Sequence, residues 1–196
     1  MCVVVLADGR EIVAAAAVVD EAGVDAGMLA AERVISALAA EDQPEQVHQA
    51  ALRLLRYRGR NERQLRTRLI GKGFSPAAVE AEIDRLRTVG LVDDRAYAAE
   101  FVEDRSRRSP RAKRLVQMEL TAQGVDRQVA FEAAQAVNDD ALAVGLAAKR
   151  LASSRPGSFD DYVARTGPFL VRRGFGYEVT RNAMRQAWDE WRTASD

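Results

Sequence analysis

The side chains in this sequence best suited to binding another molecule are arginines and lysines, and they form two dense runs. Residues 105–114 hold six cations and no acid. Residues 53–72 hold one acid, Glu62, and eight cations: Arg53, Arg56, Arg58, Arg60, Arg63, Arg66, Arg68 and Lys72. Helices that face only water usually mix the two signs, because like charges four residues apart repel. The runs therefore indicate a partner that supplies anions, with a plain solvated surface as the alternative. The excess of arginine over lysine favours bidentate contacts with phosphates or carboxylates.

No set of residues has the types and spacing that catalysis or a metal site would need. Gly71-Lys72-Gly73 lacks the spacing of a phosphate-binding loop and ends a predicted helix, where the helix dipole repels phosphate. The acidic pairs Asp93-Asp94 and Asp139-Asp140 each open a predicted helix, so we interpret them as helix caps rather than metal ligands. We therefore predict that the protein is not an enzyme and has no metal or cofactor.

The remaining chemically distinctive residues are interpreted as structural. His48 is the single histidine, and we expect it to have a surface or packing role. The single cysteine, Cys2, cannot form an internal disulfide, which favours a reducing cytoplasmic location. Trp188 and Trp191 are predicted to contribute to a core rather than to stack on bases. The apolar run 12–19 is too short for a membrane span and has no basic leader, so we predict no membrane association.

The formal net charge of zero hides a strong polarity along the chain. Residues 1–50 carry two arginines against nine acids, residues 51–114 carry seventeen cations against nine acids, and residues 115–196 carry ten cations against eleven acids. The basic middle third and the acidic amino-terminal quarter therefore differ in the partners they can attract.

The elements that position these charges are predicted from a repeated helix ending. Residues 69–74, 120–125 and 170–175 share a leucine, a glycine four residues later and an apolar residue after the glycine. This spacing is typical of a Schellman C-cap, in which glycine takes a left-handed conformation and the following apolar residue contacts the leucine. Three copies at a spacing of about fifty residues predict tandem helical repeats.

The predicted fold is mainly all-α, with three three-helix repeats in an elongated curved array. Helix starts are expected at Asn61, Ser75-Pro76 and Ser109-Pro110, among others, because these residues cap free amides or suit the first helical turn. A β-hairpin with a turn at Asp8-Gly9 and a short helix over 28–40 are predicted before the repeats. The expected domains are residues 1–45 (hairpin and short helix), 46–91, 92–137 and 138–196 (the three repeats).

Three motifs in the chain resemble the RecX family of regulators of the RecA recombinase. They are Ala51-Leu52-Arg53-Leu54-Leu55 followed by residues 63–74, Gly90-Leu91-Val92-Asp93-Asp94-Arg95-Ala96-Tyr97-Ala98 followed by residues 105–124, and residues 172–179 near the end. Small departures occur at Gln64, Gln123 and Val125, where the family usually has Glu, Lys and Ile.

The resemblance implies a cytoplasmic, non-enzymatic, monomeric protein that binds in the helical groove of the RecA–DNA filament. It implies inhibition of RecA ATPase, strand exchange and filament extension during recombination and repair, with weak to moderate binding to single- and double-stranded DNA. The basic residues expected to contact RecA or DNA are Arg63, Arg66, Arg68, Lys72, Arg105, Arg107, Arg108, Arg111, Lys113, Arg114, Arg172 and Arg173. The alternative function is a helical-repeat module that binds DNA directly, without RecA.

Overall fold

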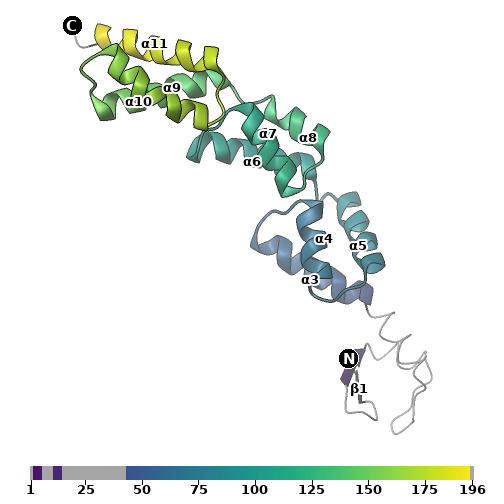
Figure 1. Ribbon diagram of the computed structural model, residues 1–196. Coiled ribbons are helices and arrows are strands. Elements are labelled where there is room, and N and C mark those ends of the chain that lie inside the picture. The colour runs from purple at the N-terminus through teal and green to yellow at the C-terminus, as the bar shows by residue number, and fades with distance from the viewer. Residues whose placement is uncertain (1, 6–10, 15–42, 195–196) are drawn as a thin grey trace. The chain divides into compact units, whose positions relative to one another are not determined.

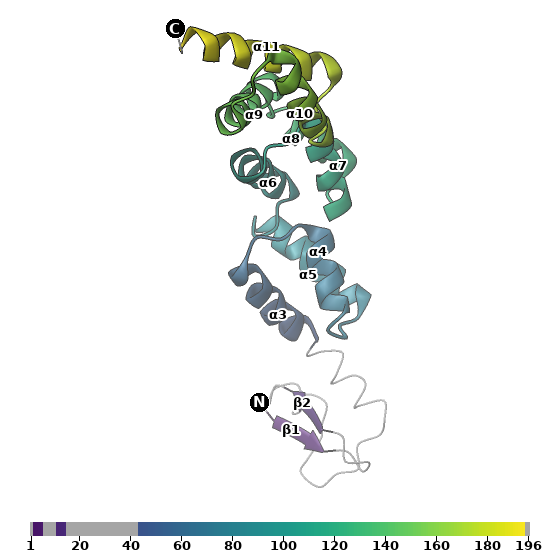
Figure 2. The same cartoon turned by 60° about the vertical axis from the view of Figure 1, so that its left-hand side comes forward.

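The computed structural model describes residues 2–5, 11–14 and 43–194, and residues 43–194 form nine helices in three consecutive triplets (Figures 1 and 2). The first triplet is α3 (Gln43–Tyr57), α4 (Glu62–Ile70) and α5 (Pro76–Thr88). The second is α6 (Asp94–Arg108), α7 (Lys113–Gln123) and α8 (Arg127–Ala134), and the third is α9 (Asp139–Ser154), α10 (Phe159–Arg172) and α11 (Tyr177–Thr193). The all-α prediction is confirmed for this part of the chain, whereas the curved array stays a prediction.

Two short strands precede the helices. β1 (Cys2–Val5) pairs antiparallel with β2 (Glu11–Ala14), and Cys2 lies opposite Ala14 in the register. The pairing agrees with the predicted hairpin. The predicted turn at Asp8-Gly9 and the predicted helix over 28–40 lie outside the described residues.

Each triplet encloses a cluster of buried apolar side chains that recur at helical spacing. Leu65 and Leu69 of α4 are fully buried in the first cluster, together with Val79 and Ile83 of α5. The second cluster includes Val116 and Leu120 of α7, Val102 of α6 and Ala130 of α8. The apolar faces predicted from the periodicity are therefore the faces that pack inside the triplets.

The third cluster is the most aromatic of the three. Tyr162 is fully buried, and its hydroxyl donates a hydrogen bond of 2.9 Å to the Ala147 carbonyl oxygen. Burial raises the pKa of Tyr162 to about 12. The rings of Trp188 and Trp191 lie 5.3 Å apart, and both side chains pack against this cluster. The core role predicted for the two tryptophans is confirmed.

The three predicted Schellman endings are present. Gly73, Gly124 and Gly174 have φ values of 91°, 99° and 90°, which is the left-handed region. In the second copy, the Val125 amide donates to the Leu120 carbonyl at 3.1 Å and the Gly124 amide donates to Thr121 at 3.0 Å. These are the two bonds that define the motif, and the same pair occurs after α4 and α10. The glycines therefore satisfy carbonyls that helix ends leave unpaired.

One predicted helix start is wrong. Ser75 caps α5, because its hydroxyl accepts a hydrogen bond of 3.3 Å from the Ala78 amide. Ser109-Pro110 does not start α7, which begins at Lys113. The carbonyl of Pro110 instead accepts a hydrogen bond from the Arg173 guanidinium, and the Ala112 amide donates to the Arg173 carbonyl. These tertiary bonds hold residues 110–112 against the end of α10, and the helix starts only after them.

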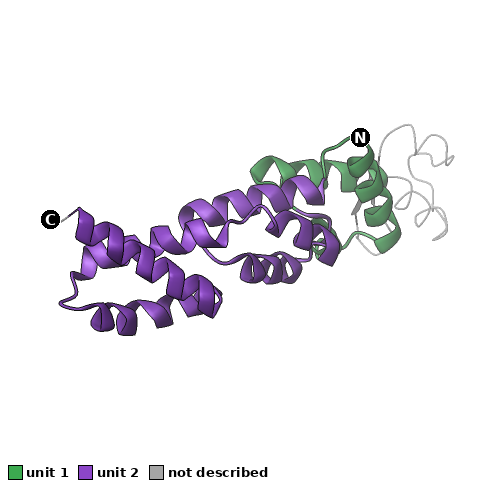
Figure 3. Cartoon of the chain, turned by 90° about the horizontal axis from the view of Figure 1, so that it is seen from above, with its two compact units in different colours: residues 1–60, 64–92 green, residues 61–63, 93–196 purple. Residues whose placement is uncertain are grey.

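The described helices divide between two compact units (Figure 3). The first consists of residues 1–60 and 64–92, and the second of residues 61–63 and 93–196. The first turn of α4 thus belongs with the second and third triplets by its contacts. The predicted domain boundaries at 45/46, 91/92 and 137/138 stay predictions. No helix in the described part of the chain is long and apolar enough to cross a membrane.

Candidate functional site

The twelve candidate contact residues lie at or near the ends of helices. Arg63, Arg66 and Arg68 are on α4, and Lys72 follows that helix. The remaining eight lie in the second unit, at the end of α6, in the segment that leads to α7, in the first turn of α7 and at the end of α10: Arg105, Arg107, Arg108, Arg111, Lys113, Arg114, Arg172 and Arg173. Their environments separate them into residues used inside the protein and residues that face solvent.

The run of cations at residues 105–114 has an acidic neighbour in the structure, although the sequence of the run contains no acid. Glu119 of α7 forms ion pairs of 2.8 Å with both Arg105 Nε and Arg111 Nη1. Only 20% of the Glu119 side chain is exposed, so solvent screens these pairs less than it would at the surface. Arg105 and Arg111 therefore join the end of α6 and the following loop to α7. A structural role explains both residues without a partner.

Three other candidates also have intramolecular anions. Arg107 and Arg108 pair with Asp104, one helical turn earlier, at 3.4 and 2.8 Å. Arg66 forms a bidentate pair with Glu80 of α5, and hydrogen bonding from Arg66 holds the pKa of the Glu80 carboxyl below its usual value. These pairs are exposed, so each contributes little to stability and a competing anion can replace the acid.

Arg173 and Arg63 contact other elements of the second unit. The Arg173 guanidinium donates to the Pro110 carbonyl at 2.9 Å and lies 4.9 Å from the centre of the Phe169 ring. The aliphatic part of Arg63 lies against Gly124 so closely that a Cβ atom there would come within 2.2 Å of Arg63 Cδ. Both arginines therefore contribute to packing as well as to surface charge.

Five candidates remain whose charged groups have no acidic partner among the described residues. They are Arg68, Lys72, Lys113, Arg114 and Arg172, and all except the half-buried Lys113 are exposed. Arg68 and Lys72 lie in the first unit, and the other three lie in the second. These five side chains can bind a partner's anions without breaking an internal ion pair.

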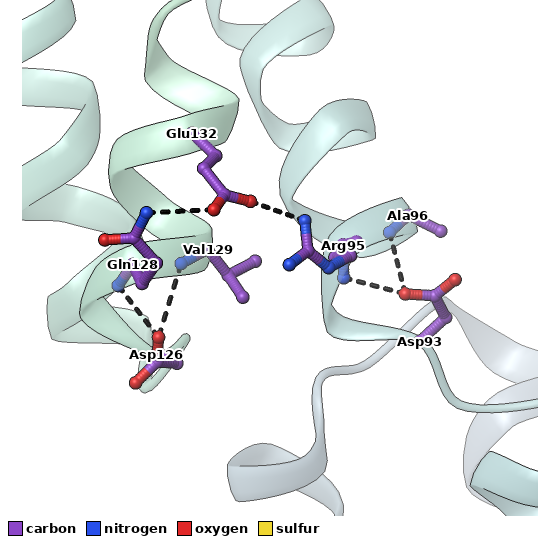
Figure 4. A network of polar contacts seen from close by, with 7 residues as sticks. All are labelled: Asp93, Arg95, Ala96, Asp126, Gln128, Val129 and Glu132. Carbon is purple, nitrogen blue, oxygen red and sulfur yellow. Dashed lines mark hydrogen bonds and ion pairs between the residues drawn. The ribbon is translucent and has the colours of Figure 1, made fainter.

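Asp93 caps the helix that its acidic pair opens, as predicted, whereas Asn138, and not the pair Asp139-Asp140, caps α9. The Asp93 carboxylate accepts hydrogen bonds from the Arg95 and Ala96 amides at 2.8 and 3.1 Å (Figure 4). Asp126 caps α8 in the same way, and its bonds to the Gln128 and Val129 amides hold the pKa of its carboxyl below the usual value. No group of acids, histidines and cysteines in the described residues could hold a metal ion.

Figure 4 also shows how a surface ion pair joins α6 to α8. Arg95 of α6 donates to the Glu132 carboxylate, which accepts a second hydrogen bond of 2.9 Å from Gln128. The Gln128 bond and then the Arg95 bond hold the pKa of Glu132 below its usual value. A capping carboxylate and a cross-helix pair thus meet at the same end of the second triplet.

Asp94 and Asp139 each cap the start of a helix other than their own. Asp139, the first residue of α9, accepts a hydrogen bond of 2.7 Å from the Lys113 amide at the start of α7. Asp94 of α6 likewise accepts a bond of 2.8 Å from the Glu62 amide at the start of α4. Ala112, the N-cap residue of α7, has no side-chain cap of its own. The carboxylates therefore connect successive triplets through a helix start.

Replacing Asp139 with Ala should destabilise the start of α7 by about 1 kcal/mol, because N-cap removal typically has this cost. The expected readout is faster hydrogen exchange at the amides of residues 113–116, whose first member would lose its acceptor. Asp140→Ala is the matched control, since that exposed acid has no bond to α7 among the described residues. Equal protection of α7 in the two variants would contradict the role assigned to Asp139.

His48 has a specific partner rather than a plain surface position. Its Nδ1 lies 2.8 Å from Oε1 of Glu82, a glutamate with only 4% of its side chain exposed. Arg85 approaches the other carboxylate oxygen at 3.8 Å. The pair joins α3 to α5 inside the first unit, so the histidine has the packing role that the sequence suggested together with a hydrogen bond that it did not predict.

Sequence reasoning missed two carboxylates that pair with candidate arginines, Glu80 and Glu119, and the capping carboxylate of Asp139, which bonds the backbone amide of Lys113. Each lies at least eight residues from the residue that it contacts, so no helical i,i+4 signal reveals it. The one signal for Glu119 in the sequence is its position one residue before the buried Leu120, on the second helix of the repeat.

Comparisons with known proteins identify related three-helix domains in this chain. Residues 48–86 match the family model for the first three-helix domain of RecX, and residues 93–133 match the model for the second. A "Regulatory protein RecX" from Pelodictyon phaeoclathratiforme is 33% identical over 135 residues, which cover 69% of this chain and 84% of the relative. The protein of the same name from Chromohalobacter salexigens is 36% identical over 144 residues, covering 72% and 93% of the two chains.

Solved structures show the same fold. A crystal structure of RecX from Lactobacillus salivarius superposes with a TM-score of 0.69 at 21% identity, covering 75% of this chain and 97% of that one. A second crystal structure, of regulatory protein RecX, gives a TM-score of 0.67 at 24% identity and covers 89% and 88%. The helix triplets are thus an arrangement found in those proteins.

Proposed function

This chain belongs to the RecX family of regulatory proteins, and from that premise we propose that it regulates the RecA recombinase by binding the RecA–DNA filament. The observation that carries the proposal is that five of the twelve candidate contact residues have no acidic partner among the described residues: Arg68, Lys72, Lys113, Arg114 and Arg172. They occur in both compact units, so the chain offers anion contacts over much of its length. A filament of RecA and DNA supplies acidic protein surface and phosphates together.

The proposed mechanism is binding in the helical groove of the filament, which lowers ATPase, strand exchange and filament extension. Tandem helical repeats suit this task because they present long surfaces to long partners. The protein acts as a monomer in the cytoplasm and needs no cofactor. Its effect on RecA comes from contact, since the family consists of regulatory proteins rather than enzymes.

The decisive experiment is titration of the protein into preformed RecA filaments while ATP hydrolysis is measured, with binding to the same single-stranded DNA measured without RecA. Inhibition at well below one protein per RecA, together with weak binding to bare DNA, is the expected result. An unchanged rate of hydrolysis and unchanged filament length would contradict the proposal.

Direct DNA binding without RecA is the second candidate, favoured by the same five cations. It predicts inhibition only at concentrations that coat the bare DNA. The affinity for DNA should also depend steeply on salt, with a slope of log K against log salt concentration of about one for each neutralised phosphate. Affinity for bare DNA weaker than roughly 0.1 mM at physiological salt would exclude it, because non-specific binders reach that affinity.

A further inference from the structure

The last residue of α3, Tyr57, exposes 86% of its surface, more than any other large hydrophobic side chain in the described residues. Its neighbours Leu54 and Leu55 are half-buried against the core of the first triplet. The ring therefore has no packing role within the described part of the protein, although tyrosines usually bury much of their apolar area. An exposed aromatic ring at the end of a helix can contact a ligand.

Three arginines surround Tyr57 in the sequence, and all of them are exposed. Arg53 lies one helical turn before Tyr57 on the same face of α3, and Arg56 and Arg58 flank it directly. A fourth arginine, Arg60, is turned inward, since its Nε donates to the Leu54 carbonyl at 3.3 Å. That bond fixes the chain just after Tyr57.

The acids on α3 and α5 are all engaged with other residues in the described part of the chain. Glu45 accepts a hydrogen bond from Gln49, Glu80 pairs with Arg66, Glu82 with His48, and Asp84 with Arg87. Arg53, Arg56 and Arg58 have no acidic partner in the described part of the chain. Arg56 lies in the last turn of α3, where a cation interacts favourably with the helix dipole. This interaction does not account for three cations around an exposed ring.

We propose that Tyr57, Arg53, Arg56 and Arg58 form a binding site for single-stranded DNA, with a base stacked on the tyrosine ring and phosphates on the guanidinium groups. An aromatic face accepts any unpaired base, and nearby arginines follow the backbone. A duplex keeps its bases stacked inside, so the ring has no face to contact there. This site lies outside the twelve candidate contacts and does not depend on RecA.

The test is the affinity of the full chain for a fluorescently labelled oligothymidylate, measured by anisotropy. Tyr57→Ala should weaken binding roughly five- to a hundredfold, which is the range found when one base stack is removed. Tyr57→Phe keeps the ring and should bind within about twofold of the parent protein. Replacing Arg53 and Arg56 with Gln should lower the log–log salt slope by about 0.7 for each phosphate that the variant no longer neutralises.

Tyr177→Ala is the matched control, because that tyrosine is also exposed, at 74%, but Arg181 beside it pairs with Glu178. The control should leave oligothymidylate affinity unchanged, and none of the variants should alter the circular dichroism spectrum. Unchanged affinity of Tyr57→Ala would overturn the proposal, as would equally weakened binding by Tyr57→Ala and Tyr57→Phe. Failure of Tyr57→Ala to inhibit RecA, with normal oligothymidylate binding, would assign the ring to a protein partner and equally overturn it.

Discussion

Gly124→Val should lower the free energy of unfolding by about 2 to 5 kcal/mol, the largest destabilisation we expect from any single substitution outside the apolar core. Two effects add at this position. The left-handed conformation, with φ of 99°, costs a residue with a side chain about 1–2 kcal/mol, and more when the side chain is β-branched. In addition, a Cβ atom would lie 2.8 Å from Arg63 Cβ and 2.2 Å from Arg63 Cδ, an overlap that costs about 1–3 kcal/mol.

Gly73→Val separates the two effects. Gly73 has nearly the same φ, 91°, in the equivalent motif, but nothing lies within 4 Å of a Cβ atom there. We expect this control to lose only the conformational part, about 1–2 kcal/mol. Urea denaturation followed by circular dichroism measures the free energy of unfolding of both variants. Equal destabilisation would show that Arg63 moves aside without cost, and an unchanged Gly124→Val variant would contradict the left-handed cap itself.

Reversing Arg68, Lys72, Arg114 and Arg172 to Glu should weaken binding to the RecA–DNA filament by roughly a hundredfold without unfolding the protein. A surface ion pair contributes up to about 1 kcal/mol, and reversal adds repulsion of similar size. These four side chains have no acidic partner among the described residues, so no internal pair is broken. Filament binding by anisotropy and the melting temperature are the two measurements.

Two comparisons make the charge reversal specific. Arg127, Lys149, Arg185 and Arg192 are also exposed and without an acidic partner in the described part of the chain, but lie outside the candidate set. Their reversal gives the same net charge, and filament affinity should then remain near that of the parent protein. If both sets weaken binding equally, net charge rather than a site explains the effect.

Arg111 is left out of the reversal for a structural reason. The sequence suggests combining it with Lys113 and Arg114, because the three lie in one basic run. In the structure it shares Glu119 with Arg105, so a glutamate at 111 would face a half-buried carboxylate. Arg111→Glu should therefore lower the melting temperature, unlike Arg114→Glu, and weaker binding by that variant would not separate a contact from a folding defect.

The features that could be predicted from the sequence are those encoded within a few consecutive residues. The Gly124 ending needs only six residues, and its hydrogen bonds form inside that segment. The buried leucines follow from helical periodicity in the same way. Ser75-Pro76 and Ser109-Pro110 look alike in sequence, yet only the first starts a helix, because Arg173 bonds the segment after the second. Local signals fail where a distant residue competes for the same backbone.

The candidate site was predictable as a charge pattern but not as a surface. The density of arginines indicates anion binding, whereas the acid that each one meets depends on how the helices cross. Glu80 and Glu119 each lie fourteen residues after an arginine that they pair with, across a helix boundary. Tyr57 shows the converse, since its sequence neighbourhood suggests a helix residue and only its exposure marks it as accessible to a ligand.

The helix caps supplied by Asp94 and Asp139 set an order of events during synthesis on the ribosome. The chain emerges amino-terminus first, so α7 leaves the exit tunnel before Asp139, which lies 26 residues after the amide that it caps. The α10 helix has its own cap, because the Ser158 hydroxyl accepts from the Asp161 amide at 3.2 Å. Each earlier triplet therefore reaches its final stability only when translation has delivered the next one, and a nascent chain stalled before residue 139 carries an α7 with a frayed start.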